Sequence, residues 1–399
     1  MQNTYRGRGP STNRNFRSNS SGRFPSKRSG NKKVFMDLSK FINKAVITEE
    51  VEEFVPEHNF QNFALETLLK HNIERKGYIT PTPIQDRAIP HILRGEDIVG
   101  IANTGTGKTA AFLIPLINKV LKNPNEKILI VTPTRELAFQ IDEELRVFAQ
   151  KSGLFSVVCI GGAGIGKQIS ELRHRHSFVI GTPGRLRDHM DSRNLDLSKF
   201  NTIVLDEADR MLDMGFIADM RYMINKMPKV RHTLFFSATL SSDIEKLINE
   251  FLTKPARISV KTRDTSKNID QDIIRTQGKD KTEVLRELLA NKEFEKILVF
   301  SRTKHGAERL ANTLLKSGIR AESIHGDKNQ AARQRALKNF KENKAQVLVA
   351  TDVAARGLDI ADITHVINFD LPATYEDYVH RIGRTGRASK KGKALTFID

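Results

Sequence analysis

Residues 102–109 have the amino-acid types that would hold the phosphates of a nucleotide. A mostly apolar run at 97–101 precedes them and another at 110–114 follows, which is the strand, glycine-rich loop and helix order of a phosphate-binding loop. Backbone N–H groups at a helix N-terminus point toward phosphate, Lys108 would meet the β and γ phosphates, and the Thr109 hydroxyl would ligate Mg²⁺. Ala102 stands where the usual pattern has glycine, so this match alone is imperfect. The residues expected to contact nucleotide are Thr104, Gly105, Thr106, Gly107, Lys108 and Thr109.

Two acidic residues end an apolar run further along the chain. Residues 202–205 have the composition of a buried parallel strand, which would deliver Asp206 and Glu207 to its carboxyl end. Open α/β sheets bind their ligands at that end. Asp206 could hold Mg²⁺ there, and Glu207 could polarise an attacking water. Together with the phosphate loop, this pair predicts an ATP-hydrolysing site that uses Mg²⁺.

Three arginines near the C-terminus recur at a spacing of three, at Arg381, Arg384 and Arg387. Arg384 and Arg387 could reach a γ-phosphate bound to another domain. Arginine fingers of this kind contribute about 10³ to 10⁵ in rate. The alternative is a basic helix end that touches the phosphates of RNA.

The charge of the chain points to a polyanionic partner. Its 399 residues carry a formal net charge of +18, and nucleic acid is favoured over membrane because no basic amphipathic helix stands out. No apolar run reaches the ~18 residues of a spanning helix, and no signal peptide opens the sequence, so we expect a cytoplasmic protein without membrane contact. The single cysteine, Cys159, excludes an internal disulfide and is expected to be buried in a strand.

The order of apolar and amphipathic segments predicts an α/β protein with two parallel sheets. Strand-like runs alternate with helical patterns, stop at a polar stretch, and then resume. Residues 1–33 contain nine basic and no acidic residues, which is typical of a disordered tail that either binds RNA or only aids solubility. The expected divisions are a basic tail and linker at 1–55, an ATP-binding domain at 56–262, a linker at 263–272 and a second domain at 273–399.

At the level of whole motifs, the chain resembles the DEAD-box ATP-dependent RNA helicase family over about residues 60–399. The resemblance implies two tandem RecA-like domains. In the family, a glutamine that ends a short motif reads adenine, and residues 77–85 match that motif with Gln85 in its place. An aromatic residue seventeen positions before the motif glycine stacks on the base. Phe60 has that spacing, and Phe63 is the competing aromatic.

The resemblance also assigns residues to RNA, to ribose and to the coupling between ATP and RNA. The RNA-binding positions it implies are Thr134, Arg135, Gly162, Thr182, Pro183 and Arg185 in the first domain, and Arg302, Gly326, Gln330, Arg333 and Thr351 in the second. Asp359 would approach the ribose. The coupling positions are Asp209, Ser237, Thr239, His380 and Arg381. The hydroxyls of residues 237–239 would bond to the acidic run at residues 206–209.

The function implied is an ATPase that closes two lobes on single-stranded RNA, locally unwinds a duplex or remodels ribonucleoprotein, and releases RNA on hydrolysis. We expect a monomer that binds RNA with little regard to sequence. Two alternatives are an ATP-dependent RNA clamp without unwinding and a DNA translocase. The sequence stops at Asp399, directly after its last expected strand, where relatives normally add a helix. We therefore expect either a truncated sequence or a compact variant, with an uncovered edge of the second sheet.

Overall fold

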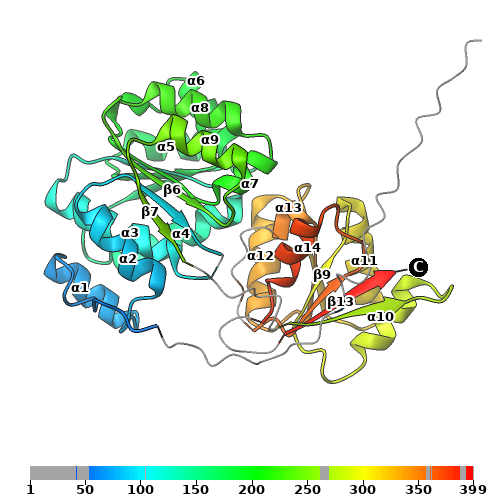
Figure 1. The fold of residues 1–399 in the computed structure, drawn as a ribbon. Helices are drawn as coiled ribbons and strands as arrows, with labels where there is room; N and C mark the ends of the chain where they lie inside the picture. Colours follow the sequence, from blue (N-terminus) through cyan, green and yellow to red (C-terminus); the bar gives the residue numbers. More distant parts are fainter. Residues whose placement is uncertain are drawn as a thin grey trace, which may run out of the picture. The chain divides into compact units, whose positions relative to one another are not determined.

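The computed structural model describes residues 42, 54–103, 105–260, 269–355, 360, 362–386 and 392–398. These residues form two α/β lobes, each built on its own parallel sheet (Figure 1). The expected fold class is thus confirmed. The basic tail and three of the expected site residues, Thr104, Asp359 and Arg387, lie outside the described residues.

The first lobe is a seven-stranded parallel sheet in the order β3-β4-β2-β5-β6-β1-β7. Its strands are β1 (Ile98–Ile101), β2 (Ile128–Val131), β3 (Ser156–Cys159), β4 (Phe178–Gly181), β5 (Thr202–Leu205), β6 (His232–Ser237) and β7 (Ala256–Ser259). Its helices are α1 (Thr67–Arg75), α2 (Pro83–Leu93), α3 (Lys108–Lys122), α4 (Arg135–Phe148), α5 (Ile165–Arg173), α6 (Pro183–Asp191), α7 (Ala208–Asp213), α8 (Ile217–Lys226) and α9 (Ser242–Phe251), with a 3₁₀ turn at Leu197–Lys199.

Both faces of this sheet are covered, as Figure 1 shows for α2 and α3 on one face and for α6, α8 and α9 on the other. The cause is the continuous apolar composition of the inner strands. In β2, Ile128 and Ile130 pack into one core, whereas Leu129 and Val131 pack into a second core on the opposite face. The carboxyl ends of the strands therefore form one edge of the sheet between two helical layers.

The second lobe is a six-stranded parallel sheet in the order β10-β11-β9-β12-β13-β8. Its strands are β8 (Ile269–Arg275), β9 (Ile297–Phe300), β10 (Ala321–Ile324), β11 (Val347–Ala350), β12 (His365–Asn368) and β13 (Gly392–Ile398). Its helices are α10 (Lys281–Leu289), α11 (Lys304–Lys316), α12 (Gln330–Lys341), α13 (Asp352–Ala355) and α14 (Tyr375–Ile382).

Two expectations about this lobe need correction. Residues 269–272, which the sequence analysis placed in the linker, belong to β8 and pair with β13. Their mixed polar pattern suits β8 because it is an edge strand, with one long side that has no neighbour in the sheet. The sequence analysis expected an uncovered edge of this sheet after its last strand, but that strand is not at an edge, because β13 lies between β12 and β8.

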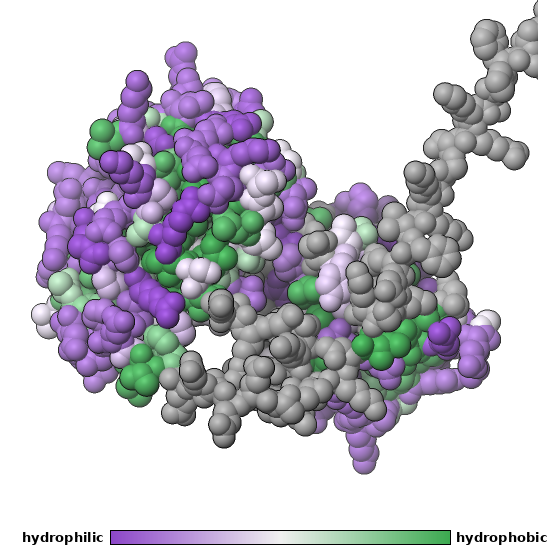
Figure 2. Space-filling model, in the orientation of Figure 1, coloured by the Kyte–Doolittle hydropathy of each residue, from purple (hydrophilic) through white to green (hydrophobic). Residues whose placement is uncertain are grey.

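On the face shown in Figure 2, hydrophilic side chains cover much of the helical surface of the first lobe. Large apolar side chains with high exposure, such as Ile79 at 82% and Val230 at 92%, are far apart in the sequence. Within the described ranges, no helix is both long and apolar enough to cross a membrane.

Cys159 is expected to be unreactive in the folded protein. It is buried at the end of β3, and burial is the main cause that raises the pKa of its thiol to about 12. The thiolate is the reactive species, so labelling by iodoacetamide at pH 8 should be at least about 10³-fold slower than in the urea-unfolded chain. Labelling that is equally fast in both states would contradict the buried placement.

Candidate nucleotide and RNA site

The phosphate loop connects β1 to α3 at the carboxyl edge of the first sheet. Gly105 and Gly107 have positive φ values of 85° and 94°, which explains glycine at these two positions. Ala102 is not among the residues with positive φ, so its side chain is compatible with the loop. Its backbone N–H donates to the Ser237 carbonyl at 3.0 Å, and its own carbonyl accepts from Lys108 Nζ at 2.8 Å. The loop is thereby tied to β6, and Lys108 is held at its start.

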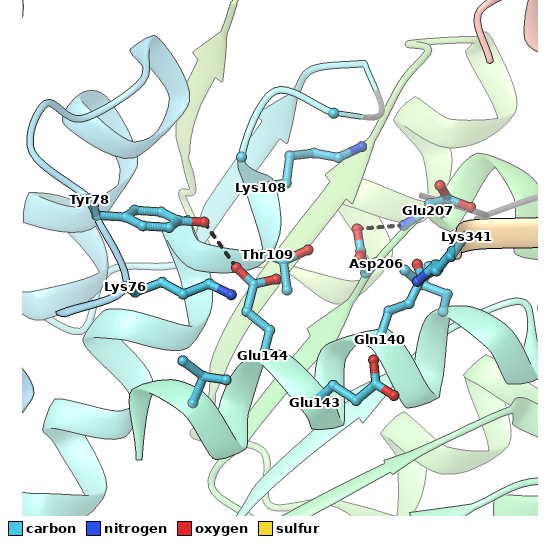
Figure 3. Close-up of a pocket in the computed structure, with 14 residues that line it drawn as sticks. Lys76, Tyr78, Lys108, Thr109, Gln140, Glu143, Glu144, Asp206, Glu207 and Lys341 are labelled. Carbon is cyan, nitrogen blue, oxygen red and sulfur yellow. Dashed lines mark hydrogen bonds between the residues drawn. The ribbon is translucent and has the colours of Figure 1, made fainter. Parts of the chain in front are cut away.

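The acidic pair lies beside this loop, as predicted from the sequence (Figure 3). Asp206 is 2% exposed and its Oδ1 accepts from the backbone N–H of Glu207 at 3.0 Å. Glu207 has φ 52° and ψ 50°, a left-handed conformation that is uncommon for residues other than glycine. Such strain concentrates at functional sites. Desolvation, with Glu207 and Asp209 nearby, raises the pKa of Asp206 to about 6, although Lys108 opposes the shift.

Replacing Asp206 by asparagine should stabilise the ligand-free first lobe. The pKa is raised in the folded state from 3.8 to about 6, so the buried carboxylate destabilises the fold at pH values above 6, and this cost is relieved as the pH falls toward 4. A shift of that size corresponds to about 3 kcal/mol at neutral pH. Urea unfolding should show the gain at pH 7 and a smaller gain at pH 5. A variant less stable than the unchanged protein at pH 7 would contradict this account.

Asp209, the second residue of α7, connects the acidic run to the segment after β6. Its Oδ2 accepts from the backbone N–H groups of Ala238 at 3.0 Å and Thr239 at 3.1 Å, and from the Thr239 hydroxyl at 3.3 Å. The expected hydroxyl bond to the acidic run is thus formed by Thr239. It is not formed by Ser237, whose hydroxyl donates to the Thr239 carbonyl at 2.8 Å. The two segments form one bonded unit beside the phosphate loop.

Gln85 connects the start of α2 to the phosphate loop. Its Oε1 accepts from the Thr82 N–H at 2.9 Å as part of a capping box, and its Nε2 donates to the Gly107 carbonyl at 3.1 Å. One amide hydrogen and one acceptor lone pair are left for a base. Phe60 and Phe63 are both 3% exposed, and Phe60 packs edge-on against Tyr78 at 5.8 Å. The stacking role of Phe60 stays a prediction.

Gln85→Ala should reduce the preference for ATP over GTP. Adenine offers a donor and an acceptor that match an amide, whereas guanine presents an acceptor where adenine has its amino group. The measurement is the ratio of the dissociation constants of the two nucleotides, and the ratio should fall toward one. Lys108→Ala is the control, because loss of a phosphate contact should weaken both nucleotides alike. An unchanged ratio in Gln85→Ala would remove the base-reading role.

Three of the residues assigned to RNA in the first lobe, Arg135, Gly162 and Arg185, meet at the turn after β3. Gly162 has φ +74°, and a Cβ there would lie 2.1 Å from Arg135 Nη1, so the Arg135 guanidinium packs directly on the glycine backbone. Arg185 Nη1 donates to the Ala163 carbonyl at 3.2 Å. Burial lowers the pKa of Arg135, but it remains a cation at neutral pH. Two guanidinium groups therefore meet at one glycine turn.

Three further residues assigned to RNA stand at the beginnings of helices. Thr134 caps α4 through a bond from the Leu137 N–H at 3.3 Å. Thr182 precedes α6 and donates its N–H to the Cys159 carbonyl at 3.1 Å, and Pro183 is the first residue of that helix. The cap explains threonine at 134, and the first position of a helix explains proline at 183. The RNA contacts of all three residues stay predictions.

In the second lobe, the expected residues follow the carboxyl ends of β9, β10 and β11. Arg302 is exposed after β9, Gly326 follows β10, and Thr351 follows β11. Gln330 and Arg333 lie on the first turn of α12 and are 7% and 5% exposed. The side-chain oxygen of Gln330 is buried and has no hydrogen-bond partner among the described residues.

His380 and Arg381 lie in the last turn of the second lobe's α14, and Arg384 follows the end of that helix. Arg384 is 6% exposed. Arg381 forms a two-point ion pair with Asp352, at 2.6 and 2.8 Å, and also donates to the Asn368 side chain and the Asp370 carbonyl. These bonds account for Arg381 as an internal brace of this lobe, and its coupling role stays a prediction.

Sequence reasoning missed the contribution of α4 to the nucleotide pocket. Besides the loop and the acidic pair, the pocket is lined by Lys76, Tyr78 and a face of α4 that presents Gln140, Glu143 and Glu144 (Figure 3). The Tyr78 hydroxyl donates to Glu144 Oε1 at 3.3 Å. The available signal was the spacing of three and four between the α4 residues, which puts them on one helical face.

Comparison with known families matches both lobes. Residues 82–247 match the model of the DEAD/DEAH box helicase family, and residues 280–389 match the model of the helicase conserved C-terminal domain. The DEAD-box ATP-dependent RNA helicase CshA of Bacillus subtilis is 47% identical over 341 residues, which are 85% of this chain and 69% of that helicase.

Solved structures agree with this match. A DEAD box protein from Methanococcus jannaschii is 41% identical with a TM-score of 0.51, and the match covers 86% of this chain and 94% of that one. Dbp5 of Saccharomyces cerevisiae, solved with RNA and ADP BeF3, is 29% identical with a TM-score of 0.75 and coverages of 85% and 89%. The motifs, both family models and these relatives agree, and the chain belongs to the DEAD/DEAH box helicase family.

Proposed function

We propose that this protein is an ATP-dependent RNA helicase that binds single-stranded RNA, unwinds or remodels duplexes or ribonucleoprotein locally, and hydrolyses ATP to release RNA. The observation that supports it most is the bonded unit made by the phosphate loop, the acidic run and the segment after β6. In this unit Ala102 bonds to Ser237, and Asp209 bonds to Ala238 and Thr239. A change at the phosphates would therefore be transmitted to the edge of the sheet.

The chemistry assigned to the chain is positioning and charge stabilisation. Lys108 would leave the Ala102 carbonyl for the β and γ phosphates, and the backbone N–H groups at the start of α3 would bind phosphate oxygens. Glu207 would orient the attacking water and accept its proton. Gln85 would read adenine, with Phe60 beneath the base and Asp359 at the ribose.

The residues at the site fit a magnesium ion. Asp206 is a buried carboxylate whose pKa is raised mainly by desolvation and further by the neighbouring Glu207 and Asp209, and Thr109 lies at the same pocket. Among the described residues there is no group of three or more His, Cys, Asp and Glu side chains that could hold a metal. Mg²⁺ does not need one, because it commonly binds one or two carboxylates together with phosphates and water. When bound, the ion would neutralise charge that develops on the phosphates.

The proposal is tested by ATPase assays with single-stranded RNA, duplex RNA and matched DNA, followed by strand separation. Stimulation by RNA over DNA together with ATP-dependent unwinding is expected, since the 2′-hydroxyl distinguishes RNA. ATP-dependent retention of RNA without unwinding would identify a clamp, and equal stimulation by DNA would identify a translocase. Either result would overturn the helicase assignment.

The remaining expectations belong to this proposal and have separate tests. The two lobes, the second of which includes β8 from Ile269 onward, would close on RNA as largely rigid bodies. A monomer would be recognised by its mass in solution. The cytoplasmic location and possible ribonucleoprotein partners stay predictions to be tested in the cell.

A further inference from the structure

Two buried polar side chains, Gln168 on α5 and His189 on α6, link two of the segments assigned to RNA. They are 3% and 0% exposed. Gln168 Nε2 donates to the Ile160 carbonyl at 3.0 Å, and Gln168 Oε1 lies 3.0 Å from His189 Nε2. The bonds therefore run from Ile160, which directly precedes the glycine turn at residues 161–162, to the helix that begins at Pro183.

The direction of each bond in this pair is determined. A carbonyl only accepts, so the Gln168 amide must present its nitrogen to Ile160 and its oxygen to His189. His189 Nε2 must then be the donor, which leaves Nδ1 as the bare acceptor of a neutral ring. Burial favours that neutral form because it lowers the pKa of His189.

The imidazole carries a cost that an apolar side chain would avoid. His189 Nδ1 is buried and has no hydrogen-bond partner among the described residues. An apolar side chain would have no such atom of its own, but it would remove the donor that the buried Gln168 Oε1 binds. The structure therefore favours a role for the bond that His189 does make, the one to Gln168.

The glycine turn held by this pair contacts two of the cations assigned to RNA in the first lobe. The Arg135 guanidinium lies on Gly162 with no room for a Cβ, and Arg185 donates to the carbonyl of Ala163, the next residue. A displacement of the Ile160 carbonyl would move this backbone and the packing surface of Arg135. The positions of both guanidinium groups thus depend on the Gln168 bond.

We propose that Gln168 and His189 are positioning residues that hold the glycine turn in the geometry that binds the RNA backbone. The inference rests on the proposed function, because it concerns the RNA site. It adds two residues that contact no RNA and that act through Ile160. Their loss should weaken RNA binding and leave maximal turnover largely unchanged.

The test measures the RNA concentration for half-maximal ATPase stimulation, with oligouridylate as the RNA. Gln168→Ala and His189→Leu should each raise it by about 3- to 10-fold, the effect of about one hydrogen bond. The double variant should show no more than either single one, because both remove the same link. His189→Gln should restore near-normal binding, since its amide can donate to Gln168.

The matched control is Asn72→Ala in the same lobe. Asn72 is also a 3% exposed amide that donates to backbone carbonyls, those of Phe148 and Gln150 at 2.8 and 2.9 Å, but it lies away from the glycine turn. It should lower the melting temperature like Gln168→Ala without changing the RNA requirement. If Asn72→Ala and Gln168→Ala raise the RNA concentration for half-maximal stimulation equally, the role of Gln168 is only structural.

Other outcomes also decide the matter. If Gln168→Ala does not fold, binding of fluorescein-labelled oligouridylate by His189→Leu and His189→Gln replaces it, and equal weakening in these two would overturn the proposal. If RNA stimulates the ATPase of the protein without substitutions and every variant binds RNA with normal affinity, this inference alone is overturned. An unchanged protein that neither binds RNA nor is stimulated by it would overturn the proposed function and this inference together.

Discussion

Replacing Arg384 by alanine is expected to lower RNA-stimulated ATP hydrolysis by about 10³- to 10⁵-fold. The expected cause is loss of a cation that stabilises charge on the transferring phosphate. This residue follows α14 in the second lobe, whereas the phosphate loop belongs to the first. ATP affinity measured without RNA should therefore stay close to that of the unchanged protein.

Two other arginines of the second lobe serve as controls for Arg384. Arg309 is exposed on α11, and its replacement should leave both the rate of RNA-stimulated hydrolysis and the ATP affinity unchanged. Arg381 is bound to Asp352 within the lobe, so Arg381→Ala should lower the melting temperature as well as the rate. If Arg384→Ala weakened ATP binding as much as hydrolysis, the arginine would contact bound ATP before the reaction. It would then not act as an arginine finger that stabilises the transition state.

Glu207→Gln should lower turnover by about 10²- to 10⁴-fold, the range expected when a positioned general base is removed. The amide has nearly the same shape as the carboxylate, but it cannot accept the proton of the attacking water. ATP and RNA binding should persist, so the variant should hold both ligands for longer than the unchanged protein. Single-turnover hydrolysis and nucleotide affinity measure the two effects separately.

The pocket offers a control for Glu207 that has the same charge. Glu143 lines it from α4 and is exposed, so Glu143→Gln removes an equal charge away from the predicted water position. Its turnover should remain within a few-fold of normal. Near-normal hydrolysis by Glu207→Gln, or an equal loss in both variants, would contradict the assigned role.

Sequence patterns predicted most of the sheet architecture because the inner strands are continuous apolar runs. Residues 128–131 and 202–205 could be recognised in this way, and they lie side by side in the first sheet. Strand β8 escaped prediction because it is an edge strand with polar residues at 270–272, a composition that loops share. Its pairing with β13 depends on contacts between residues far apart in the chain, which local patterns do not encode.

The site shows the same division between local and long-range information. The phosphate loop and the acidic pair could be predicted because each motif is contiguous and follows an apolar strand. The packing of Arg135 on Gly162 and the bond from Gln85 to Gly107 join residues on different elements. No spacing rule relates such pairs, because the sheet order decides which loops meet.

The pairing of β8 with β13 has a consequence for synthesis on the ribosome. Gly392 pairs with Ile269 and Ile398 with Arg275, so the first and last strands of the second sheet are neighbours. All strands of the first sheet lie between Ile98 and Ser259. The amino-terminal lobe can thus complete its sheet while later residues are still being translated. The carboxyl-terminal lobe must keep β8 unpaired until translation reaches β13, and during this interval the nascent chain exposes a strand edge to aggregation and to chaperones.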